Sequence, residues 1–170
     1  MKKILGLAAL TASIFGCSTA FAQQTCAAPG SWIPDATGNP ALVGDTCGGS
    51  SEFISLCQLG TSDNPHPERI YRVVLAAAGP ARTATSVTVA GGNASFTPLA
   101  GIYGGDCNNN SDNCAQVAAA GESFPLAAVA AGTYFLAVTA ASFDAPNACG
   151  PFTLTTNGTF PVSLQNFSVE

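Results

Sequence analysis

The sequence predicts an all-β protein, a two-sheet antiparallel sandwich closed by disulfides. Many short segments rich in β-branched and aromatic residues alternate with Gly, Pro and Asn turns, which is typical of sandwich folds. No segment beyond residue 22 carries a 3.6-residue apolar stripe with helix caps. Six of the seven cysteines also lie beyond residue 22. The length of 170 residues suits a single domain.

The N-terminal 22 residues are predicted to be a signal peptide. Lys2 and Lys3 precede an apolar run, Ile4–Phe15, and a small-x-small cleavage pattern ends at Ala22. The run is shorter than the roughly 20 residues that span a bilayer. We therefore expect a secreted or periplasmic chain without a transmembrane segment. In the alternative, the segment that ends at Cys17 resembles a lipobox, and the chain is a lipoprotein anchored through that cysteine.

The charge of the chain beyond residue 22 excludes nucleic acid as a partner. Three arginines face ten acids there, a net charge of −7, because both lysines precede the cleavage site. A lysine-free acidic surface cannot neutralise a row of phosphates.

An exported chain meets an oxidising compartment, so the six remaining cysteines are expected to form disulfides. Cys47 and Cys57 bracket a short Gly/Ser segment, and Cys107 and Cys114 bracket an Asn-rich one, so each pair is expected to close its own loop. Cys26 and Cys149 then remain and are expected to pair with each other. Spacing alone leaves the connectivity open. A metal site is disfavoured, because the sequence contains no Cys-x-x-Cys.

Along the chain, residues 23–44 are predicted to be an irregular arm that precedes a β-sandwich domain at 45–170. Strands are expected at Ile70–Leu75, Ser86–Val89, Ala94–Leu99, Thr133–Thr139, Phe152–Thr156 and Val162–Val169, with weaker candidates at 102–103, 115–119 and 123–129. The second and third of these strands are separated by a Gly-Gly-Asn turn and predict a hairpin. The expected core contains Tyr71, Phe96, Phe135, Leu136, Phe152, Leu154 and Leu164.

Three of these segments resemble the bacterial pre-peptidase C-terminal (PPC) domain. They are Pro67–Leu75, Ala131–Val138 with its Gly-Thr-Tyr sequence, and Gly150–Leu154. The resemblance covers roughly residues 45–157. It implies a jelly-roll-like β-sandwich that serves as an accessory module of exported enzymes.

No residue pattern predicts catalysis. The single histidine, His66, lies between two prolines, and no Gly-x-Ser-x-Gly elbow is present. A metal set of Asp63, His66 and Glu68 is disfavoured, because strand alternation would separate its members. A glycoside hydrolase needs a pair of carboxylates, but some pair can always be chosen from ten acidic residues. The sequence therefore gives no specific indication of a hydrolase.

One loop has the composition of a calcium site. Asp106, Asn108, Asn110 and Asp112 recur at every second position, a spacing that lets a loop wrap a hard cation. The full EF-hand pattern fails, since Ser111 replaces its glycine. The alternative is a solvated turn-rich loop. Ca²⁺ is the one cofactor that the sequence suggests.

Two aromatic residues are candidates for ligand binding: Trp32 in the N-terminal arm and Tyr103 among glycines. In the alternative, Trp32 packs beneath the arm.

We therefore expect a non-catalytic exported β-sandwich module that binds an extracellular or cell-envelope polymer, either a polysaccharide or a protein. The alternative is a structural cell-surface protein that self-associates through an edge strand such as Val162–Val169.

Overall fold

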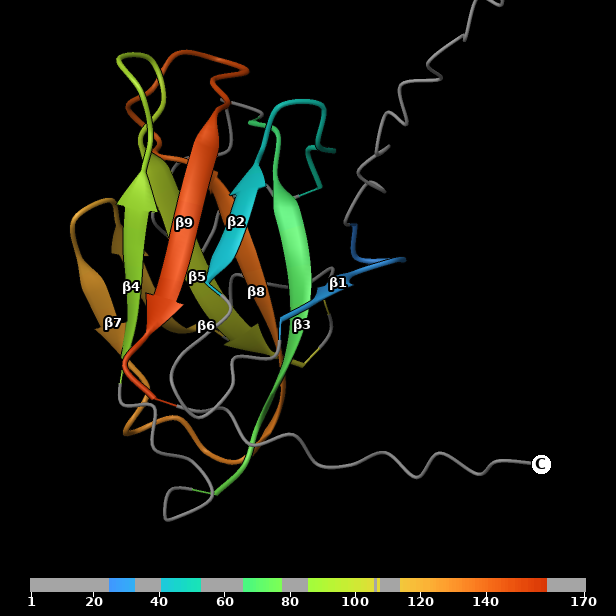
Figure 1. The fold of residues 1–170 in the computed structure, drawn as a ribbon. Coiled ribbons are helices and arrows are strands. Elements are labelled where there is room, and N and C mark those ends of the chain that lie inside the picture. The colour runs from blue at the N-terminus through green and yellow to red at the C-terminus, as the bar shows by residue number, and fades with distance from the viewer. Residues whose placement is uncertain are drawn as a thin grey trace, which may run out of the picture.

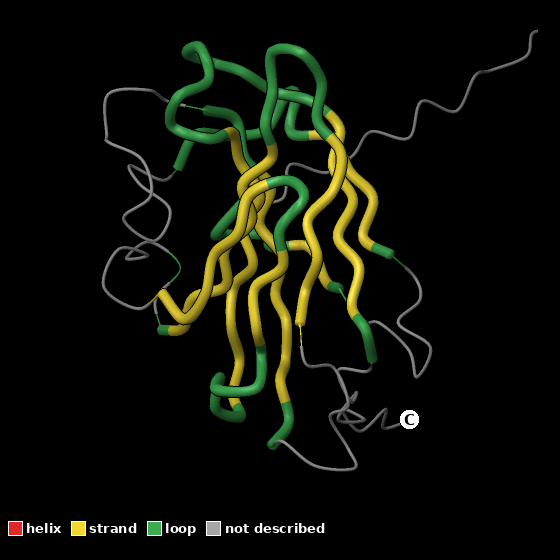
Figure 2. Tube along the Cα trace, turned by 90° about the vertical axis from the view of Figure 1, so that its left-hand side faces the viewer, coloured by secondary structure: helices red, strands yellow, loops and turns green. Residues whose placement is uncertain are grey.

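The computed structural model describes residues 25–32, 41–52, 66–77, 86–105, 107 and 114–158. Within these ranges the chain forms nine strands and no helix (Figure 2). The strands are β1 (Gly30–Ser31), β2 (Leu42–Asp45), β3 (Arg69–Leu75), β4 (Ser86–Gly91), β5 (Pro98–Gly104), β6 (Cys114–Ala119), β7 (Ser123–Pro125), β8 (Gly132–Ala140) and β9 (Pro151–Thr156).

The strands form two sheets, in the orders β1-β3-β8-β5-β6 and β2-β9-β4-β7. All neighbouring pairs are antiparallel except β1 with β3. In Figure 1, β4, β9 and β2 lie in front of β5 and β8. The orders 3-8-5-6 and 2-9-4-7 describe an eight-stranded jelly roll, to which β1 adds a short edge. The predicted two-sheet sandwich is confirmed.

The core between the sheets follows from strand alternation, because successive side chains point to opposite faces. In β9, Phe152 and Leu154 are buried whereas Thr155 is exposed. In β3, Tyr71, Val73 and Leu75 point inward. Of the expected core residues within the described ranges, Phe135 is half-buried and the others are buried; Leu164 lies outside those ranges.

A second apolar cluster covers the opposite face of β3, β8 and β5. It contains Ile70, Leu99, Tyr103, Cys107 and Ala137. Six successive residues of β5, from Pro98 to Tyr103, are therefore buried. A strand buried on both faces has no polar alternation, which explains why the sequence pattern of β5 was weak.

The structure differs from the sequence predictions at the expected hairpin and in the N-terminal arm. The expected hairpin does not form, because β4 and β5 belong to different sheets. Gly91 and Gly92, with φ of 103° and 98°, turn the chain from one sheet to the other. The arm is also not wholly irregular: β1 pairs with β3 and β2 pairs with β9. Strands of two and four residues are too short to show a period.

The disulfides join Cys26 to Cys107 and Cys47 to Cys149, so the predicted pairings are wrong. Cys47 follows β2 and Cys149 precedes β9, and these two strands are neighbours in one sheet. Spatial proximity of the strand ends therefore decides the pairing, not sequence proximity. Cys114 is also disulfide-bonded; Cys57 lies outside the described residues.

These disulfides indicate an oxidising compartment, extracellular or periplasmic. In the described part of the chain, no helix has the length and apolarity needed to cross a membrane.

Candidate functional site

Three loop segments meet at one end of the sandwich and form a surface that we call the loop platform. They are residues 46–52 after β2, 92–97 between β4 and β5, and 141–150 between β8 and β9. They form the coloured loops at the top of Figure 1.

Backbone hydrogen bonds join these segments to one another. The Thr46 amide donates to the carbonyl of Gly150 at 3.0 Å, and the Gly150 amide donates to Thr46 Oγ1 at 3.1 Å. The Ala141 amide donates to the carbonyl of Thr97 at 2.9 Å. The Cys47–Cys149 disulfide adds a covalent link between the first and third segments. The platform is thus a fixed arrangement of loops.

The segment 141–150 consists of two consecutive tight turns. The Asp144 amide donates to the carbonyl of Ala141, and the Ala148 amide donates to that of Ala145, both at 3.0 Å. The second turn has Pro146 followed by Asn147 at φ 60°. Pro followed by a residue with positive φ is the signature of a type II turn, and Asn tolerates that backbone conformation.

Phe143 occupies the second central position of the first turn, and 78% of its surface is exposed. Three large hydrophobic side chains are exposed in the described ranges, and Phe143 is the aromatic one among them. The others, Val43 and Val74, lie on strands. The platform therefore presents one phenyl ring to solvent.

The chain is anchored on both sides of Phe143. Before it, the Ala141 amide donates to the Thr97 carbonyl at 2.9 Å. Asp144 accepts hydrogen bonds from the Thr97 amide at 2.6 Å and from the Thr97 hydroxyl at 3.3 Å. Further along, Cys149 is fixed by its disulfide to Cys47. These anchors limit the conformations that the backbone of the turn can adopt, so they fix the point from which Phe143 projects.

Close contact between two platform segments requires glycine at position 150. A Cβ atom on Gly150 would lie 2.6 Å from Asn93 Nδ2 and 2.8 Å from Phe96 Cδ1. The Asn93 side chain is fixed in turn, because its Oδ1 accepts the Ser95 amide at 2.8 Å.

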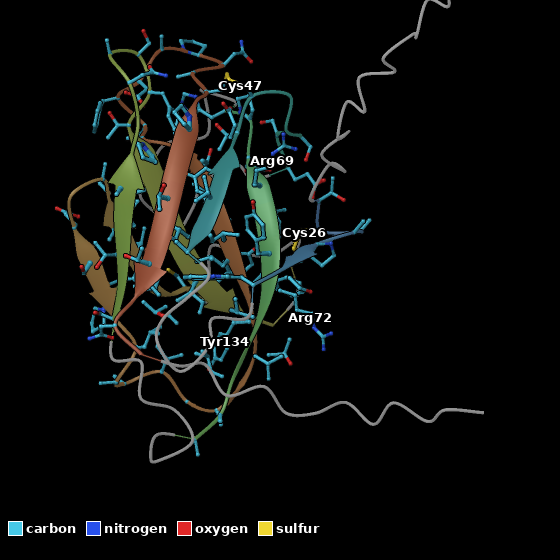
Figure 3. All side chains as sticks on the ribbon, viewed as in Figure 1. Cys26, Cys47, Arg69, Arg72 and Tyr134 are labelled. Carbon is cyan, nitrogen blue, oxygen red and sulfur yellow. A yellow bond between two sulfur atoms is a disulfide. The ribbon has the colours of Figure 1, made fainter. Side chains whose placement is uncertain are left out.

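A buried arginine supports the first platform segment from below. Arg69 is 6% exposed; its Nε donates to the Asp45 carbonyl at 2.8 Å and its Nη2 to the Cys47 carbonyl at 2.9 Å. Figure 3 shows Arg69 next to this end of the molecule, whereas Arg72 points away into solvent. Nη1 has no hydrogen-bond partner within the described structure. The guanidinium thus fixes the path of the chain into the disulfide.

The neighbouring positions His66 and Glu68 are also buried. Both ring nitrogens of His66 lack hydrogen-bond partners in the described structure, and burial lowers the pKa of the imidazole, opposed by the negative charge of Asp144. Glu68 Oε1 accepts the backbone amide of Glu52. The Glu52 carboxylate accepts the Cys26 amide at 2.8 Å and the Ser50 hydroxyl at 3.1 Å. Among the described residues, no three His, Cys, Asp or Glu side chains form a metal-binding group.

The two aromatic residues that the sequence suggested for ligand binding are both buried. Trp32 is 3% exposed and belongs to the core between the sheets. Tyr103 is fully buried; its ring stacks on Phe135 at 5.9 Å, and its hydroxyl lies 3.4 Å from Cys107 Sγ. Burial raises the pKa of this hydroxyl, with smaller contributions from the Glu68 and Glu52 carboxylates. Each side chain packs in an apolar cluster, so neither is exposed to a ligand, and Trp32 is packed as the alternative expected.

The candidate calcium ligands Asp106, Asn108, Asn110 and Asp112 lie outside the described residues. The loop that carries them is not closed by a Cys107–Cys114 bond, because Cys107 is joined to Cys26.

Sequence reasoning missed Phe143. One signal was available: a single aromatic residue stands in the turn-rich Ser142–Asn147 segment, between two clearly predicted strands. Aromatic residues in such loops are seldom needed for the core.

No known protein family, curated protein or solved structure matches the chain.

Proposed function

We propose that this protein is a non-catalytic exported module that binds an extracellular or cell-envelope polymer, a polysaccharide or a protein, through its loop platform. The observation that carries this proposal is Phe143, a largely exposed aromatic ring on a loop whose backbone is anchored before it at Ala141 and after it at Asp144. Binding residues are often found on loops that a rigid scaffold positions. Aromatic side chains also contribute much of the binding energy at recognition surfaces.

Two features of the sequence support export and an accessory role. The N-terminal segment has the pattern of a signal peptide cleaved near Ala22, with lipidation of Cys17 as the alternative. The segments that resemble the PPC domain contribute β3, β8 and β9 to the sandwich. That family usually forms accessory modules of secreted enzymes, in keeping with a non-catalytic role for this chain.

The test is a pull-down with the exported, processed chain, purified with its disulfides intact. It is incubated with insoluble polysaccharides, with peptidoglycan and with collagen, both in calcium and in chelator. We expect retention on one polymer and loss of retention in Phe143→Ala. The control variant is Val74→Ala, which removes an exposed apolar side chain from β3.

Retention that disappears in chelator would support a calcium site in the 106–112 loop. If no polymer retains the chain and large species form as its concentration rises, the binding role is overturned in favour of self-assembly.

A further inference from the structure

We propose that the loop platform binds a neutral glycan, with one sugar ring stacked on Phe143 and its hydroxyl groups hydrogen-bonded by the amides of Asn147 and Asn93. This inference rests on the proposed binding function and names the chemistry of the polymer.

The ring of Phe143 defines the first part of the site. A phenyl face carries partial negative charge and attracts the C–H groups on the apolar face of a sugar ring. Phenylalanine has no polar atom at its tip, so a group that stacks on it is apolar on the contacting side. A ligand that is soluble in water must carry its polar groups elsewhere. A pyranose ring meets both conditions.

Exposed polar groups on the same platform define the second part. Asn147 is exposed and lies four residues from Phe143, in the adjoining turn. Asn93 and Ser95 are exposed on the neighbouring segment, which contacts this loop at Gly150. Amides and hydroxyls both donate and accept hydrogen bonds, as sugar hydroxyls do.

The charge of the platform argues against acidic polymers. Within its described segments the charged residues are Glu52 and Asp144, and both are acidic. Of the described arginines, Arg69 is buried and Arg72 is on the middle of β3. A polyanion would therefore meet no cation within the three described platform segments, and a chain of net negative charge would repel it.

A protein partner fits the same surface poorly. Stable protein interfaces bury a central cluster of aromatic and aliphatic residues within roughly 800 Å² per partner. The platform offers one exposed large hydrophobic side chain among small and polar residues. Such a surface suits a narrow ligand that contacts one ring and a few amides.

The rigidity of the loops favours binding of such a ligand. Two hydrogen-bonded turns, the Asp144–Thr97 contact and the Cys47–Cys149 disulfide order the loop backbone that carries Phe143 and Asn147 before a ligand arrives. A preorganised loop avoids the entropic cost of ordering its backbone on binding.

The test is a titration of the exported, processed chain with soluble neutral oligosaccharides (cello-, xylo-, malto- and chito-oligomers) and with the acidic polymers alginate and polygalacturonate. Affinity is measured by calorimetry. We expect one neutral series to bind, Phe143→Ala to weaken binding at least about tenfold, and Phe143→Trp to retain it. Asn147→Gly keeps the positive φ and removes only the amide, so a weakening of about three- to tenfold is expected. Val74→Ala is the control and should bind as the unmodified chain does.

Three outcomes would overturn the inference. Neutral glycan binding that survives Phe143→Ala would place the site elsewhere on the protein. Preference for alginate or polygalacturonate would refute the neutral glycan while leaving the binding function intact. Absence of binding to every polymer would refute the proposed function itself. Equal melting temperatures of the variants would show that the fold is unchanged.

Discussion

At the scale of single residues, the usual relation between polarity and exposure is reversed at the platform: two polar side chains are buried and an aromatic one is exposed. Arg69 and His66 are buried next to it, while Phe143 is exposed on it. A buried guanidinium needs hydrogen-bond acceptors, and the carbonyls of Asp45 and Cys47 provide them. The exposed ring has no comparable structural reason, which is why we assign it to binding.

Arg69 is expected to be a major contributor to stability. Arg69→Ala would leave two buried carbonyl groups without their charged donor, so the free energy of unfolding should fall by about 2 to 4 kcal/mol. Arg72→Ala, on the exposed side of the same strand, is the matched control and should cost less than about 0.5 kcal/mol. Denaturant unfolding of both variants measures the difference. Similar losses in the two variants would contradict this role.

His66 is expected to make the fold less stable in acid. Burial lowers its folded-state pKa below the ordinary value of 6.5, so the folded protein binds fewer protons than the unfolded chain as the pH falls below that value. The contribution of the neutral His66 side chain to the free energy of unfolding is complete above pH 6.5, and it is lost as the pH decreases toward the folded-state pKa. Unfolding curves between about pH 8 and pH 5 measure it. The profile of His66→Gln should be flatter; parallel profiles would show that other groups cause the change.

At the scale of elements, the β8–β9 connection is the part of the fold on which the proposal depends. Its residues form two turns that are linked to both neighbouring segments, so they cannot be displaced independently. The disulfide is the strongest of these links, because it closes a separation of 102 residues.

Removal of this disulfide is expected to affect both stability and binding. A loop of roughly 100 residues corresponds to about 4 to 5 kcal/mol in the chain-entropy model, so the double variant Cys47→Ser/Cys149→Ser should lose several kcal/mol of unfolding free energy. If the variant stays folded, it should also bind glycan more weakly, since its loop is less ordered. The double variant Cys26→Ser/Cys107→Ser, which lacks the disulfide that does not join the Phe143 loop, should lose stability with little change in glycan affinity once folded.

At the scale of the whole molecule, disulfides fix both layers of the jelly roll. One bond lies beside the second apolar cluster, and the other joins the ends of β2 and β9. Peptide mapping without reduction should yield Cys26 linked to Cys107 and Cys47 linked to Cys149. Cys114 should be recovered with Cys57, the cysteine that remains in a chain cleaved after Ala22. Recovery of a Cys107–Cys114 peptide would contradict the observed pairing.

A polymer-binding module is also expected to be monomeric. Light scattering after size exclusion should give one mass across a wide concentration range. Growth of the mass with concentration would support the alternative of a self-assembling surface protein.

The sequence by itself determined the fold class and the main strands. The alternating patterns of β3, β4 and β9 and the Gly-Thr-Tyr segment of β8 are local, and burial of one side of a strand imposes them directly. No alternation of apolar and polar residues marks β1 and β2, because they are short. The alternation is weak at β5, because this strand is buried on both faces.

Only the tertiary structure decided which strands are neighbours, and the remaining corrections follow from that. Pairing of β2 with β9 brings Cys47 to Cys149, although Cys57 is closer in sequence. The placement of β4 and β5 in different sheets replaces the expected hairpin with a crossing. The same topology buries Trp32 and Tyr103 and leaves Phe143 exposed on the platform. Local sequence limits each residue to a strand or a turn, but contacts between distant segments determine which side chains water can reach.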